Sequence, residues 1–202
     1  MLLSRFKGNL YPLVIEAQTS FYGSMLSVNI RVISRRAERE SRYEADERRS
    51  SGALWFAIKN RLSTGDRMRV WGLQQECLLC GEKDETRYHL FFACPYSFMV
   101  WVRATGSLLG NRITPDWQDT VTRIQYDRGN KMDMVLMRMV FQMAVYHIWR
   151  ERNTRRHGKA WIPMEKLAYQ IDKTMRNIIL SLRYSYGSKL EGLMRRWFEV
   201  TS

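Results

Sequence analysis

Beyond residue 50, apolar residues recur three or four positions apart along most of the chain, which is the spacing of one helix face. The alternation of apolar and polar residues that marks a strand never lasts more than a few residues. The predicted helices cover 54–62, 66–69, 95–106, 114–124, 132–157 and 163–184. The sequence therefore predicts a mainly α fold built around a helical domain.

Start and stop residues set the bounds of these helices. Ser63-Thr64-Gly65 ends the first helix, and Asp66 is a candidate cap for the short second one. Pro95 and Thr114-Pro115 are favourable helix starts. Glycine just past a basic last turn, as at Gly158, is a favourable helix end.

The two longest predicted helices, 132–157 and 163–184, are joined by the short connection 158–162. Short connections favour antiparallel neighbours. The first of these helices is rich in Met, whose side chain adapts to an irregular partner surface. We therefore expect the two helices to pack as an antiparallel pair.

Charge and composition narrow the class of protein. The chain has 202 residues, of which 45% are hydrophobic, enough for a packed core. Its net charge is +13, and residues 103–202 carry most of the excess of Lys and Arg. Such a surplus favours polyanionic partners, either nucleic acid or an anionic membrane face. We find no apolar run of ~20 residues and no signal peptide, so we expect a nuclear or cytoplasmic protein that does not enter a membrane.

All three cysteines lie within one 18-residue window that also holds a histidine. The spacing is Cys77-x2-Cys80-x8-His89-x4-Cys94. Three thiolates and one imidazole are a standard tetrahedral zinc set, and four protein ligands leave no open position for a substrate. We therefore predict that the helical domain carries a small Cys3His zinc-binding insertion with one structural Zn²⁺ per chain, rather than three ordinary cysteines.

The residues around this window extend the prediction. Leu90-Phe91-Phe92 should pack beneath the metal as its hydrophobic surroundings. Three thiolates and one Zn²⁺ leave a net negative site, whose charge Lys83 and Arg87 would offset.

The stretch LWFAIKNRLSTGDRMRVWGLQQECLLCGEKDETRYHLFFACPYSFMVW resembles the zinc-binding domain found after the reverse transcriptase in plant LINE-type retrotransposons. The matching positions are Trp55, 60–68, Trp71-Gly72, Cys77, Cys80, Glu85-Thr86, 89–92, Cys94-Pro95 and Val100-Trp101. The resemblance implies a nucleic-acid-associated zinc module with the four ligands named above. The tail, through 148–153 and 171–173, is a looser match.

This resemblance divides the chain into three parts. Residues 1–50 match nothing in the family and are a linker or disordered segment. Within it, 31–49 are interpreted as a solvated helix or a disordered linker rather than as a binding element. Residues 51–106 are the reverse-transcriptase-type zinc-binding domain, and residues 107–202 are a basic helical C-terminal region. Because the polymerase itself is missing, we interpret the chain as a detached or relic fragment.

The sequence offers no catalytic constellation. No nucleotide-binding glycine loop, nucleophile–base motif or Mg²⁺-binding aspartate pair stands out, so we predict a non-enzyme without a small-molecule substrate. His147 and Glu151 lie one helical turn apart, but two ligands make no metal site and a packed histidine is the better interpretation. Of the tryptophans near the zinc window, Trp55 and Trp101 are expected in the core rather than at a base-stacking surface.

Two candidate functions are compatible with these features of the sequence. The first is sequence-tolerant binding of RNA or DNA, led by basic residues of the second half. The predicted nucleic-acid-binding residues are Arg150, Arg152, Arg155, Arg156, Lys173 and Arg176. Four to six phosphate contacts would give a log–log salt slope of roughly −3 to −5. The alternative is a zinc-stabilised structural or protein-interaction domain.

Overall fold

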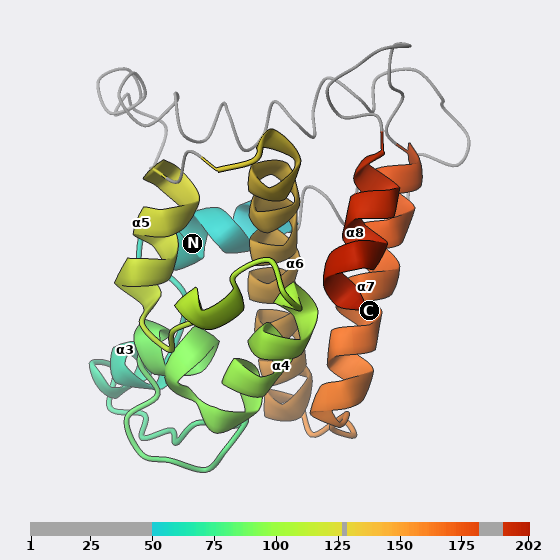
Figure 1. Cartoon of the computed structure of the whole chain (residues 1–202). Helices are drawn as coiled ribbons and strands as arrows, with labels where there is room; N and C mark the ends of the chain where they lie inside the picture. The colour runs from blue at the N-terminus through green and yellow to red at the C-terminus, as the bar shows by residue number, and fades with distance from the viewer. Residues whose placement is uncertain (1–49, 127–128, 182–191) are drawn as a thin grey trace, which may run out of the picture.

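The computed structural model describes residues 50–126, 129–181 and 192–202, which form helices and turns without a strand (Figure 1). The elements are α3 (Gly65–Arg69), the π-helical turn η1 (His89–Ala93), α4 (Pro95–Thr105), the 3-10 turn η2 (Gly110–Arg112), α5 (Trp117–Tyr126), α6 (Lys131–Arg156), α7 (Met164–Ser181) and α8 (Leu193–Thr201). Residues 50–58 are helical as well. The predicted mainly α fold is confirmed.

Helix α6 runs through the middle of the fold, with α4, α5, α7 and α8 against it (Figure 1). Its first turn is capped by Asn130, whose side chain accepts a hydrogen bond from the Met132 N–H at 2.8 Å. Helix α7 returns beside α6 in the opposite direction, and Thr174 Oγ1 lies 3.3 Å from His147 Nε2 across the contact. The predicted antiparallel pair is therefore confirmed, and His147 is the packed histidine that we expected.

Helix α4 begins and ends where the sequence predicts. Pro95 is its first residue, and Gly106 follows its last residue with a φ of 53°, a left-handed conformation that favours glycine. A Cβ at Gly106 would lie 2.1 Å from the Val200 carbonyl oxygen. The same oxygen accepts a hydrogen bond from the Ser107 N–H at 2.8 Å. The end of α4 is thus joined closely to the end of α8.

Three details of the first helices differ from the prediction. The first helix covers residues 50–58 rather than 54–62. Gly65 is the first residue of α3 rather than the end of the preceding helix, and Asp66 lies in the first turn of α3 rather than at its cap. The reason is Glu85, whose side chain accepts from the Gly65 N–H at 3.0 Å and whose backbone oxygen accepts from the Asp66 N–H at 3.1 Å. Because residues 65 and 85 are far apart in the sequence, no local pattern indicates this cap.

One hydrophobic core serves the described residues on both sides of position 106. At its centre the Phe92 ring lies 5.0 Å from the ring of Trp101, 5.6 Å from that of Trp117 and 6.0 Å from that of Phe141. Trp101 is fully buried as expected, whereas Trp55 is half-buried. The predicted zinc-binding and C-terminal parts therefore share a core. Residues 1–49 of the predicted N-terminal segment lie outside the described residues.

Candidate metal centre

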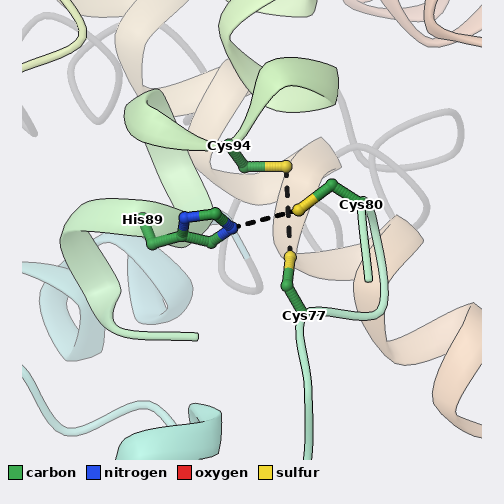
Figure 2. A group of neighbouring side chains, drawn as sticks. All are labelled: Cys77, Cys80, His89 and Cys94. Atoms are coloured by element: carbon green, nitrogen blue, oxygen red, sulfur yellow. Dashed lines mark hydrogen bonds between the residues drawn. The ribbon is translucent and has the colours of Figure 1, made fainter. Parts of the chain in front are cut away.

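The four predicted zinc ligands converge on one point in the structure (Figure 2). The ligand atoms of Cys77, Cys80, His89 and Cys94 all lie within 4.8 Å of one another. Cys77 Sγ is 4.0 Å from Cys94 Sγ, and Cys80 Sγ is 3.2 Å from His89 Nε2. Among the described residues, no other group of His, Cys, Asp and Glu side chains forms such a cluster.

These separations fit a tetrahedral zinc ion. With Zn–S bonds of about 2.3 Å and a Zn–N bond of about 2.0 Å, the edges of the tetrahedron are roughly 3.5 to 3.8 Å long. The separations of 3.2 Å between Cys80 Sγ and His89 Nε2 and of 4.0 Å between Cys77 Sγ and Cys94 Sγ bracket this range. Small movements of the side chains would therefore bring all four atoms to bonding distance, and three soft thiolates with one imidazole are a donor set that zinc prefers.

A tight turn presents the first two sulfurs. The Gly81 N–H donates to the Cys77 carbonyl oxygen at 2.7 Å, and the Cys77 N–H donates to the Glu82 carbonyl oxygen at the same distance. Gly81 has a φ of +82°, which explains why glycine follows the second cysteine. The turn brings the sulfurs of Cys77 and Cys80 into one cluster, where both could bind a single ion.

His89 is positioned by both its backbone and its ring. The Thr86 hydroxyl accepts from the His89 N–H at 3.1 Å and so caps the turn that follows. Ring atom Nε2 faces the sulfurs, whereas Nδ1 lies 3.5 Å from Glu82 Oε2. A carboxylate behind a metal-binding imidazole fixes its orientation and raises its basicity.

Cys94 stands at the N-cap of α4, directly before Pro95. Its N–H donates to the His89 carbonyl oxygen at 2.7 Å, a bond between residues five apart that closes η1. A hydrogen bond from the Cys77 thiol, assisted by backbone N–H groups of Ser97 and Tyr96, lowers the pKa of Cys94 to about 5. The same thiol–thiolate contact raises the pKa of Cys77. One sulfur of the set is thus already stabilised as the thiolate that a metal requires.

The centre is enclosed on its inner side. Cys77 and Cys94 are buried, and so are Leu90, Phe91 and Phe92. The predicted hydrophobic layer beneath the ligands is therefore confirmed. When bound here, zinc would be held by four protein atoms and would hold together two stretches of chain, 77–80 and 89–94.

Two of the predicted nucleic-acid-binding arginines point into the zinc-binding part instead of into solvent. The Arg155 guanidinium donates to the carbonyl oxygens of Leu78 and Leu79, both at 3.1 Å, and to Glu151 Oε1 at 2.9 Å. It also stacks on the Tyr96 ring at 4.5 Å. Arg155 therefore holds the turn between the first two cysteines, and we correct its predicted role.

Arg152 is the clearer correction, because its side chain is 0% exposed. Two of its N–H groups donate to the Glu85 carboxylate: Nη2 lies 2.7 Å from Oε1, and Nε lies 3.1 Å from Oε1 and 3.3 Å from Oε2. Nη2 also donates to the Ser63 carbonyl oxygen at 2.9 Å. Glu85 is equally buried and also accepts from Gly65. A guanidinium in this position has no access to a phosphate; it joins α6 to the zinc-binding part.

The other predicted basic residues lie at the surface. Arg150, Arg156 and Lys173 are exposed, while Arg176 is partly exposed and forms an ion pair with Asp172. Of the cations expected to offset the charge of the centre, Lys83 is exposed but Arg87 is buried and donates to the carbonyl oxygens of Ala57 and Ile58. The guanidinium that contacts the turn between Cys77 and Cys80 is that of Arg155.

Sequence reasoning missed the roles of Glu82 and Glu85. A carboxylate close to a ligand histidine is a sequence feature that could have indicated Glu82. Glu85 stands in a charged loop, GEKDET, where nothing distinguishes a buried carboxylate from solvated ones. Glu151, weighed as a metal ligand, instead accepts from Arg155 and from the Ile162 N–H at 3.0 Å.

Comparison with known proteins agrees with the geometry of the centre. Residues 44–101 match the family model described as zinc-binding in reverse transcriptase. This range includes all four ligands and ends within α4. It begins seven residues before the predicted domain, so residues 44–50, which we assigned to the N-terminal segment, match the family model as well. No curated protein and no solved structure matches the chain. In the part of the chain that the structure describes, no helix is long and apolar enough to cross a membrane.

Proposed function

We propose that this chain is a non-catalytic, zinc-stabilised module that binds RNA or DNA through exposed cations. The observation that carries the proposal is the division of the basic residues of α6. Arg152 and Arg155 are used to build the zinc-binding part, whereas Arg150 and Arg156 remain exposed on a chain whose net charge is +13. Phosphates are the partners that such a surface attracts.

The family match also supports nucleic-acid binding. A zinc-binding part described from reverse transcriptases belongs to enzymes that work on nucleic acid. The proposal includes an origin in a LINE-type retrotransposon of the plant type, a detached or relic state, and a nuclear or cytoplasmic location. In this proposal zinc is structural, because four protein ligands leave it no open coordination position.

A second candidate function is protein interaction. The loop after α3 exposes three large apolar side chains, with Val70 at 83%, Trp71 at 65% and Leu73 at 53%. Neighbouring exposed apolar residues are typical of interaction sites. On this alternative the basic surface is merely solvated, and the zinc serves only to hold the fold.

The experiment is a salt titration of the zinc-loaded full chain against single-stranded RNA, single-stranded DNA and a duplex of equal length. If about four exposed cations neutralise phosphates, log affinity should fall with log salt at a slope of roughly −3 to −4. This slope lies at the shallow end of the range predicted from sequence, since Arg152 and Arg155 no longer count. No binding of the folded, zinc-loaded protein at physiological salt would favour the interaction module.

A further inference from the structure

An open groove of about 540 Å³ lies between the helix at residues 50–58 and the last turns of α6. Its floor is apolar and aromatic, and includes Phe56 and Trp149. Its rim carries Arg150, His157 and Lys159, all exposed. No Asp or Glu is among the described residues that line it.

The groove occupies a side of α6 that the rest of the fold leaves open. Arg152 and Arg155 point to the zinc-binding part, and His147 and Glu151 face α7 and the residues before it. Trp149, Arg150 and Asn153 instead line the groove. The long basic helix thus has two packed sides and one side with aromatic rings and cations.

The aromatic floor is held in place while remaining accessible. The Arg152 guanidinium stacks on the Trp149 ring at 5.0 Å, and Arg152 is itself fixed by Glu85. Phe56 packs edge-on against Trp55 at 5.1 Å and keeps 45% of its surface exposed. Large exposed rings lose little entropy on binding because they have few rotatable bonds.

We infer that this groove is the site where the module takes unpaired nucleotides of a single strand, with a base stacked on Phe56 and phosphates held by Arg150 and Lys159. The inference rests on the proposed function and assigns it a surface. The chemistry of the lining favours this occupant: aromatic rings stack on bases of any sequence, and neighbouring cations follow the backbone. A duplex keeps its bases stacked inside, so it can meet only the cationic rim.

The experiment compares the affinity of the full chain for a 12-nucleotide oligo(dT) strand and a 12-base-pair duplex at one salt concentration. Phe56→Ala should weaken binding of the strand by roughly five- to a hundred-fold, the range typical of one lost base stack. Binding of the duplex should change less than twofold. Phe56→Tyr, which keeps a ring, should retain the affinity for the strand.

Matched controls lie outside the groove. Trp71→Ala removes an exposed aromatic side chain after α3, and Lys173→Ala removes an exposed cation on α7. We expect Trp71→Ala to leave the affinity for the strand within twofold of the parent, and Arg150→Ala to weaken it more than Lys173→Ala. Zinc content and melting temperature, measured for every variant, report whether the fold is intact.

The outcomes separate the inference from the proposed function. If the parent binds neither oligonucleotide, the proposed function is wrong and the groove loses its occupant. If the parent binds both but Phe56→Ala, folded and zinc-loaded, keeps its affinity for the strand, the groove assignment is wrong and the proposed function stands. Equal competition by poly-glutamate would show that the surface responds to charge alone, and would overturn the stacking contact.

Discussion

The last two turns of α6 carry four arginines within seven residues, and two of them are used differently from the other two. Arg152 and Arg155 are the inward pair. Arg152 donates to the buried Glu85 carboxylate, and Arg155 donates to the carbonyl oxygens of Leu78 and Leu79, in the turn between the first two cysteines. Arg150 and Arg156, the outward pair, are exposed, and Arg156 Nη2 also lies 3.9 Å from Met68 Sδ. The residue type is the same, and what differs is the set of acceptors within reach. Arg156 follows Arg152 by about one turn on the same face of the helix, yet it lies at the surface.

The difference shows that a basic run in a sequence need not be a basic patch in space. A buried guanidinium is tolerated only where acceptors satisfy its fixed set of donors. Arg152 has these acceptors in Glu85, in the Ser63 carbonyl oxygen and in Asn153 Oδ1 at 3.1 Å. The inward pair therefore stabilises the fold together with the zinc ligands, whereas the outward pair is accessible to a binding partner.

Removal of zinc should have the largest effect on this arrangement. Structural zinc contributes roughly 10–16 kcal/mol of apparent binding free energy in zinc-finger peptides. Because those peptides are unfolded without the metal, this binding free energy drives their folding. We expect a strong chelator to unfold residues 77–94 and to free the inward pair, while α6 and α7 keep part of their contact. Hydrogen exchange measured with and without chelator checks this, and zinc added back should restore protection. Unchanged protection of residues 77–94 would contradict it.

Breaking the buried ion pair should have the next largest effect. Arg152→Ala leaves the Glu85 carboxylate buried without its cation, a change that typically costs about 3–5 kcal/mol. The double variant Glu85→Gln with Arg152→Met should be less destabilised than Arg152→Ala, because neither side chain is then charged. Denaturant unfolding of both variants measures the free energies. A double variant that is less stable than Arg152→Ala would speak against the pair as described.

Arg155→Ala should have a smaller effect on stability. It leaves the carbonyl oxygens of Leu78 and Leu79 without their donor, and an unsatisfied buried polar group costs about 1–3 kcal/mol. Arg155→Lys keeps the charge but not the forked geometry, and should recover only part of the loss. Thermal unfolding of the zinc-loaded variants compares their melting temperatures with that of the parent. An unchanged melting temperature in Arg155→Ala would show that Arg155 does not stabilise the turn between Cys77 and Cys80.

The outward pair should matter least for stability. Arg150→Ala with Arg156→Ala is expected to change the free energy of unfolding by no more than about 0.5 kcal/mol, as is usual for surface substitutions. The same variant should flatten the salt slope of nucleic-acid binding by about 1.5 to 2 units, since each lost phosphate contact removes about 0.7 to 0.9. An unaltered slope would show that phosphates are bound elsewhere.

Features that depend on residues close together in the sequence could be predicted, whereas contacts between residues far apart in the sequence could not. The zinc ligands lie within 18 residues, and their spacing alone indicated a set that the structure brings together. Helix starts at Pro95 and near Pro163 were predictable for the same local reason. The Glu85–Arg152 pair joins residues 67 apart, and nothing in either neighbourhood says which arginine turns inward. The cap of α3 by Glu85 escaped prediction in the same way.

The most direct test of the central claim, that the inward arginines and the zinc ligands form one structural unit, is zinc affinity. Competition with a chromophoric chelator should be measured for two matched double variants, Arg152→Ala/Arg155→Ala and Arg150→Ala/Arg156→Ala. Loss of groups that support a metal site typically lowers affinity 10- to 100-fold. We predict a loss of about this size for the inward variant and an affinity within twofold of the parent for the outward one. Equal zinc affinities in the two variants would contradict the account.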